Sequence, residues 1–65
     1  MNKPMWLVCY KRDEDGPTCT NLVHAWTYDN IEYKYGKCAW YTAQYVKFTW
    51  QADEARAKGM PEVWC

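Results

Sequence analysis

Serine is absent from this 65-residue sequence, and aliphatic residues are scarce, with two Leu, one Ile and four Val. Without Ser, a Ser-His-Asp catalytic arrangement is excluded. Net charge is missing as well, because eight Lys and Arg residues balance eight Asp and Glu residues. No global electrostatic field therefore draws the chain toward nucleic acid or an anionic membrane.

Aromatic residues are abundant instead: five Trp, six Tyr and one Phe. With so little aliphatic mass, these rings must supply much of the core. The length predicts one domain, residues 1–65, at a size where a hydrophobic core alone gives marginal stability. Inward positions cannot hold every ring, so we expect exposed aromatics, and Trp and Tyr are enriched at protein interfaces.

No apolar run near the first residues is long enough for a signal peptide or a membrane span, because Lys11 and Arg12 interrupt it. We therefore expect a cytoplasmic protein that does not enter a membrane. In a reducing compartment its four Cys are expected to be thiols. If the protein is oxidised, Cys9 and Cys19, on either side of a predicted turn, are the first pair expected to form a disulfide.

Short runs of apolar and β-branched residues, separated by turn residues, predict three β-strands. They cover about residues 5–11, 20–28 and 31–35. The turn between the first two is DEDGP at 13–17, and Asp29 with Asn30 is interpreted as a tight hairpin turn before the alternating segment IEYKY.

The segment KCAWYTAQYVKFTW, residues 37–50, can be interpreted as a helix or as a strand. As a strand, neither of its faces is uniformly apolar. As a helix, its polar residues form one stripe at helical spacing, namely Gln44, Lys47, Gln51, Glu54 and Lys58. Gly59 and Pro61 then supply a helix end. We predict one helix over about 38–58; the alternative is a strand to Trp50 followed by a short helix over 51–58.

The predicted fold is α+β, a three-stranded antiparallel sheet with the long helix packed on one face. Alternate strand residues then share the covered face. That face is predicted to hold Trp6, Val8, Tyr10, Leu22, Trp26, Tyr28, Ile31, Tyr33 and Tyr35. The tail MPEVWC, residues 60–65, could dock along a sheet edge or beside the helix.

No residue pattern predicts catalysis or a bound cofactor. His24 could pair with a Cys, but nothing in the local sequence places them together. The four Cys are far apart and include no C-x-x-C pair, so no metal site is predicted either. We expect a protein that is not an enzyme.

Binding to another protein is the function that the pattern favours. The predicted helix has a second apolar stripe that one sheet cannot easily cover. This stripe is interpreted either as a wide core-facing arc that the tail completes or as a docking surface with Trp50 as its anchor. Trp40 falls in line with the polar stripe and should be exposed. The candidate partner-binding residues are Trp40, Ala43, Val46, Trp50, Asp13, Glu14 and Asp15. We expect a regulator or inhibitor that occupies a partner protein's surface, of the kind that phages and other mobile elements often encode. A homodimer is a further candidate assembly.

The alternative is a nucleic-acid-binding domain that uses an aromatic sheet, either AP2-like or by base stacking. It is less favoured, because the basic residues are dispersed and phosphate neutralisation normally supplies much of the affinity.

Overall fold

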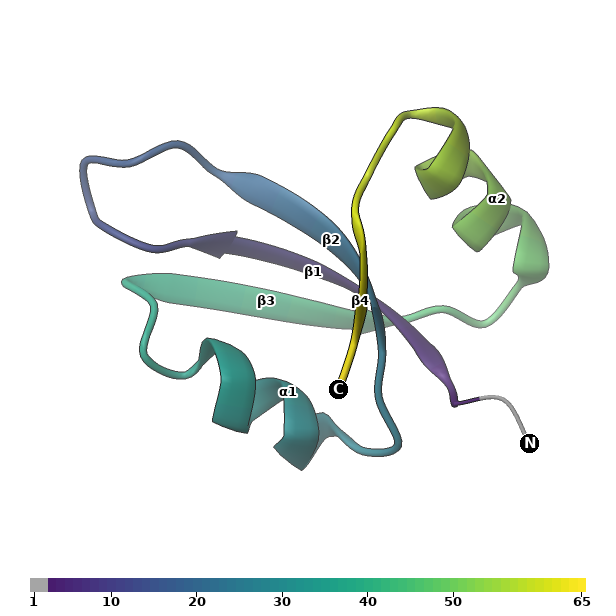
Figure 1. The fold of residues 1–65 in the computed structure, drawn as a ribbon, viewed down its shortest axis with the longest axis horizontal. Helices are drawn as coiled ribbons and strands as arrows, with labels where there is room; N and C mark the ends of the chain where they lie inside the picture. The colour runs from purple at the N-terminus through teal and green to yellow at the C-terminus, as the bar shows by residue number, and fades with distance from the viewer. Residues whose placement is uncertain (1–2) are drawn as a thin grey trace.

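The computed structural model describes residues 3–65. Six elements follow one another in the order β-β-α-β-α-β (Figure 1). They are β1 (Met5–Lys11), β2 (Cys19–His24), α1 (Tyr28–Tyr35), β3 (Trp40–Tyr45), α2 (Thr49–Ala57) and β4 (Glu62–Trp64). The fold is α+β, but the prediction of three antiparallel strands and one long helix is wrong. Within residues 3–65 the sheet has four strands and is mixed, and there are two helices.

The sheet has the strand order β3-β1-β2-β4. β1 coincides with the predicted strand 5–11 and pairs antiparallel with both β2 and β3. The turn between β1 and β2 is closed by the Gly16 N–H, which donates to the Asp13 carbonyl at 3.0 Å. β2 ends at His24, earlier than the predicted 20–28, so Trp26 lies outside the sheet.

The predicted strand over 31–35 is wrong, because this segment belongs to α1. Asn30 does not make a hairpin turn. Its side-chain oxygen accepts a hydrogen bond from the backbone N–H of Thr27 at 3.3 Å, as in a capping box that starts a helix. Asp29 in the first turn and Lys34 in the last turn stabilise the helix, because their charges interact favourably with the helix dipole.

The side chains of α1 follow the helical period. Ile31 and Tyr35, four residues apart, are buried against the sheet, whereas Tyr33 between them is 90% exposed. The expected burial of all three on one strand face is therefore wrong.

The predicted helix over 38–58 is also wrong. Residues 40–45 form β3, which suits their content of Trp, Tyr and Thr, and the shorter α2 begins only at Thr49. The Gln51 side chain fixes this start, because its oxygen accepts hydrogen bonds from the backbone N–H groups of Lys47 and Phe48 at 3.1 and 3.2 Å. The alternative of a strand followed by a short helix comes closer to the structure.

Gly59 ends α2 as the sequence indicated. It has φ of 79°, and its N–H donates to the Arg56 carbonyl at 3.0 Å. The Met60 N–H donates to the Ala55 carbonyl at 3.1 Å, which completes a Schellman motif.

The tail docks on the free edge of β2, where β4 runs parallel to that strand. The Leu22 N–H donates to the Pro61 carbonyl at 2.8 Å, and the Cys65 N–H donates to the His24 carbonyl at 2.9 Å. The Trp64 ring stacks on the His24 ring with centroids 3.7 Å apart.

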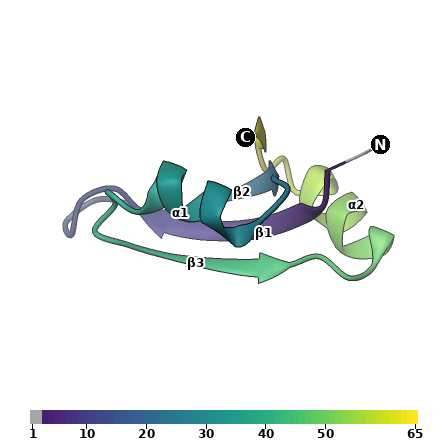
Figure 2. The same cartoon turned by 90° about the horizontal axis from the view of Figure 1, so that it is seen from below.

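The two helices cover different faces of the sheet. α1 covers a cluster that holds Val8, Val23, Ala25, Ile31 and Tyr35. α2 covers a smaller cluster on the other face, made of Leu22, Val46 and Ala52. Figure 2 shows α1 beside β1 and α2 beyond the end of β3. Leu22 was expected on the same face as Val8, but it pairs with Leu7 and so lies on the α2 face.

Candidate functional site

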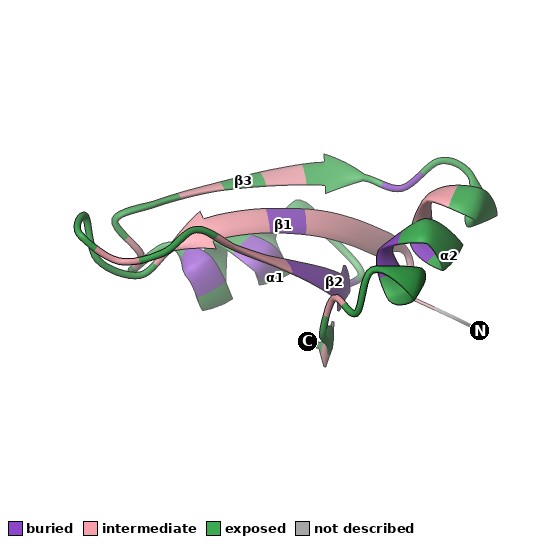
Figure 3. Ribbon diagram, turned by 90° about the horizontal axis from the view of Figure 1, so that it is seen from above, coloured by how far each residue is buried: buried purple, intermediate pink, exposed green. Residues whose placement is uncertain are grey.

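The face of the sheet against which α2 packs is covered only at one end. The rest of it is lined by alternate residues of three strands, which we call the open face: Cys9, Lys11, Thr20, Trp40, Thr42 and Gln44. All six are half-buried or exposed, and β3 has no buried residue along its length (Figure 3). The Cα atoms span only 16 Å in the shortest dimension, so this face is a broad surface of a thin molecule.

Trp40 is the largest side chain of the open face and is 45% exposed. It lies opposite Lys11, and the preceding Ala39 N–H donates to the carbonyls of Lys11 and Arg12 at 2.8 and 3.2 Å. These bonds tie the start of β3 to the end of β1, where the turn begins. Trp40 therefore lies at the end of the sheet that carries the acidic turn.

The acidic turn consists of the predicted site residues Asp13, Glu14 and Asp15, all of which are exposed. The Lys11 ammonium donates to the Glu14 carbonyl at 3.0 Å, which holds the lysine over the turn. The structure thus brings Trp40 and the acidic turn to one end of the molecule.

Trp50 lies at the other end, beyond β3. It is 59% exposed, and its ring stacks with Phe48 at a centroid distance of 6.5 Å. Together with Leu7 and Met60 it lines a shallow hollow between α2 and the sheet. Since β3 from Trp40 to Tyr45 is about 17 Å long at the usual rise per residue, the two Trp side chains mark opposite ends of this side of the molecule.

The structure separates the other two predicted residues from this surface. Ala43 faces α1, where it packs against the cluster around Val8, and Val46 is buried under α2 with Leu22. Ala43 and Val46 were grouped with Trp50 as one stripe of the predicted helix, and Trp40 was placed in line with the polar stripe of that helix. Because the segment is a strand and a loop before α2, they do not share a face.

His24 is buried beneath Trp64 and makes no hydrogen bond through Nε2 to any residue from 3 to 65. Its nearest charged group is the Glu62 carboxylate at 3.9 Å. The same carboxylate pairs with Arg56, and this interaction raises the pKa of the guanidinium. In the part of the chain that the structure describes, no three His, Cys, Asp or Glu side chains are grouped so that they could hold a metal ion.

The four Cys side chains are free thiols. The expected pair for a disulfide, Cys9 and Cys19, lies on neighbouring strands but in successive registers: Cys9 opposes Thr20, and Tyr10 opposes Cys19. Their side chains therefore point to opposite faces of the sheet. That bridge would require the strands to shift in register.

A tyrosine pair on the α1 side was not predicted. The hydroxyls of Tyr28 and Tyr41 share a hydrogen bond at 3.3 Å, which raises the pKa of Tyr41 to about 12. The sequence signal for it was the strand alternation of WYTAQY, which places Tyr41 and Trp40 on opposite faces.

None of the family models matches the chain, and the searches of curated proteins and of solved structures also find no match. Between residues 3 and 65, neither helix is long and apolar enough to cross a membrane.

Proposed function

We propose that the protein is a small non-enzymatic binding module that docks a partner protein on its open face and thereby regulates or inhibits that partner. The supporting observation is the unequal cover of the sheet. α1 packs over one face, whereas α2 protects only one end of the other and leaves the exposed Trp40 ring on it.

The chemistry of the open face favours a protein over a nucleic acid. Lys11 is its only cation, and three carboxylates follow in the adjacent turn, where they would repel phosphates. Two other cations of the described chain are already paired: Lys58 with Glu54 at 3.1 Å, and Arg56 with Glu62. Thr and Gln side chains beside a Trp ring offer hydrogen bonds around an apolar anchor, which is the usual anatomy of a protein interface.

Trp40 is expected to be the energetic anchor. Truncation of a central aromatic anchor typically costs about 2 kcal/mol or more of binding free energy, or roughly thirtyfold in affinity. The acidic turn beside it would form the polar rim and would select a partner with basic groups near the Trp pocket.

The test compares Trp40→Ala with Trp26→Ala. Trp26 is 50% exposed, close to the value for Trp40, but it lies between β2 and α1, outside the sheet. Both variants should stay folded by circular dichroism. Only Trp40→Ala should lose capture of the partner that wild-type protein recovers from a lysate of its source cell. Equal capture by the two variants would remove the open face from the functional account.

A salt series on the captured complex separates the alternative. Affinity for DNA or RNA that falls steeply with salt and depends on Trp40 would support the nucleic-acid interpretation instead. Weak salt dependence with a protein ligand is the result expected here.

A further inference from the structure

β3 is an outer strand of the sheet, and its far edge has no neighbouring strand among residues 3–65. The Val46 N–H donates to the Met5 carbonyl at 3.0 Å, and this bond shows which residues of β3 form hydrogen-bonded pairs with β1. Hydrogen-bonded pairs alternate along an antiparallel ladder, so Thr42 and Gln44 direct their backbone groups to β1. The backbone N–H and C=O groups of Tyr41, Ala43 and Tyr45 point outward.

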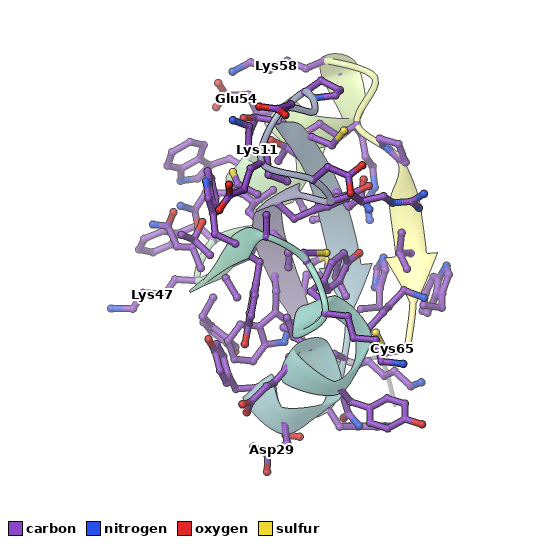
Figure 4. All side chains as sticks on the ribbon, turned by 90° about the vertical axis from the view of Figure 1, so that its left-hand side faces the viewer. Lys11, Asp29, Lys47, Glu54, Lys58 and Cys65 are labelled. Atoms are coloured by element: carbon purple, nitrogen blue, oxygen red, sulfur yellow. The ribbon has the colours of Figure 1, made fainter. Side chains whose placement is uncertain are left out.

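This edge lacks the features that usually protect an outer strand. Proteins commonly place Lys, Pro or a bulge on such an edge to prevent pairing with another chain. β3 reads WYTAQY, with no charge, no Pro and no Gly. The charged residues nearest to β3 in sequence, Lys37 and Lys47, lie beyond its two ends. Figure 4 shows Lys47 projecting away from the ribbon, on the side opposite Cys65.

We infer that β3 binds the β3 of a second copy, antiparallel, about a twofold axis at Ala43. The self-complementary order of the side chains supports this occupant. In that register Tyr41 lies opposite Tyr45 of the other copy and Thr42 lies opposite its Gln44, while the small Ala43 faces its own equivalent at the axis. Each outward-pointing residue then donates one hydrogen bond and accepts one.

The side-chain pairs fit this arrangement on both faces. The Tyr41 and Tyr45 rings meet on the α1 face, where cross-strand aromatic pairs stabilise antiparallel strands. Tyr45 is 51% exposed, and its ring is already held edge-on to Trp6 at 5.3 Å. Thr42 and Gln44 can hydrogen-bond on the open face. No charged residue of either copy opposes a like charge within the strand, because Lys47 would lie opposite Ala39.

The pairing is separate from the docking proposed for the open face. Its backbone hydrogen bonds lie in the plane of the sheet, whereas the open face presents side chains perpendicular to that plane. Thr42 and Gln44 of the open face also lie at the dimer contact. It would join the two sheets into one and place two open faces side by side. One six-residue strand from each copy makes a small interface, so the dimer should be weak and dependent on concentration.

The first test is Ala43→Pro, examined by sedimentation over a range of concentrations. The Ala43 N–H points away from β1, so proline removes one dimer hydrogen bond from each copy, two in all, and none of the monomer's own ladder. Wild-type protein should dimerise as its concentration rises, and Ala43→Pro should stay monomeric while retaining the wild-type circular dichroism spectrum. A wild-type protein that is monomeric at all concentrations, or a dimer that a folded Ala43→Pro protein keeps, would overturn the inference.

The second test examines the register and does not depend on the proline variant folding. T42K/Q44K sets two pairs of like charges opposite one another across the axis, and T42K/Q44E sets two pairs of opposite charges. At the usual energies of cross-strand pairs, the first should weaken the dimer roughly two- to thirtyfold. The second should leave the dimer at least as strong as wild type. Equal weakening of the dimer by both variants would contradict the register. Hydrogen exchange gives a further check: if the β3 amides are protected only when a different protein is added, the self-pairing is contradicted.

Discussion

Replacing Ile31 with alanine distinguishes the observed helix α1 from the strand that the sequence pattern suggested. Ile31 is fully buried in the cluster with Val8 and Val23. The change removes three carbon atoms, which at about 0.8 kcal/mol each is about 2.4 kcal/mol, and the cavity left behind adds to that. We expect Ile31→Ala to lower the free energy of unfolding by about 2–5 kcal/mol.

That loss is large beside the total stability expected for a chain of this length, about 3–10 kcal/mol. The matched control is Tyr33→Ala, two residues along the same segment. Tyr33 is 90% exposed, so its truncation should change stability by no more than about 0.5 kcal/mol, and alanine's better helix propensity could make the protein slightly more stable.

Urea denaturation followed by tryptophan fluorescence measures both effects, with circular dichroism confirming that each variant is folded in the absence of urea. In a strand, Ile31 and Tyr33 would lie on the same face and would both be core residues. Equal losses in the two variants would therefore refute the helical assignment of 28–35.

Three further outcomes follow from the geometry. Gly59→Ala should cost about 1 kcal/mol of unfolding free energy in the same denaturation assay, because Gly59 has φ of 79° and an alanine is strained there. The free energy of unfolding should fall as the pH rises from about 10 to about 12. The pKa of Tyr41 is about 12 in the folded protein and about 10 in the unfolded chain, so the stability that this difference gives below pH 10 is lost as Tyr41 ionises. Tyr28→Phe should make that fall smaller, and denaturation curves at stepped pH values measure the change. Protein purified without reductant and then denatured should titrate as free thiol at Cys9 and Cys19, because they face opposite sides of the sheet, and a Cys9–Cys19 disulfide found by mass spectrometry would contradict the register of β1 and β2.

The sequence predicts those parts of the fold that depend on local chemistry. The strand at 5–11, the turn at 13–17 and the helix end at Gly59 all rest on short-range signals: a bounded apolar run, Asp-Gly-Pro residues, and a glycine that can adopt positive φ. The α+β class follows from the same signals.

Two segments were misassigned because their patterns fit both periods. In IEYKY, Ile31 and Tyr35 are four apart, a spacing that one helix face and one strand face share, and only Tyr33 distinguishes the two. In the segment that follows Gly36, a polar stripe at helical spacing was given more weight than the β propensity of Trp, Tyr and Thr. The β4 pairing could not be predicted either, since a parallel partner far away in the chain leaves no local signal.

The candidate site was likewise predicted only in part. Trp40 was expected to be exposed and is, and Trp50, interpreted either as core or as a docking anchor, is exposed as well. They do not share one helix, because Trp40 begins β3 and Trp50 lies in α2. Ala43 and Val46 were grouped with Trp50 by helical spacing, and the change of period moves Ala43 to the α1 face and Val46 into the core. The face of each residue in this segment depends on its secondary structure, which composition alone did not decide.

Site-specific photo-crosslinking tests the proposed docking on the open face most directly. A photoreactive phenylalanine derivative replaces Thr42, which lies on the open face midway along β3, in one protein and Tyr33, on the far side of α1, in another. Both positions are exposed, so both proteins should remain folded. We expect the partner to be crosslinked from position 42 and not from position 33. Crosslinking from position 33 with none from position 42 would contradict the account, because the partner would then contact the helical side of the sheet.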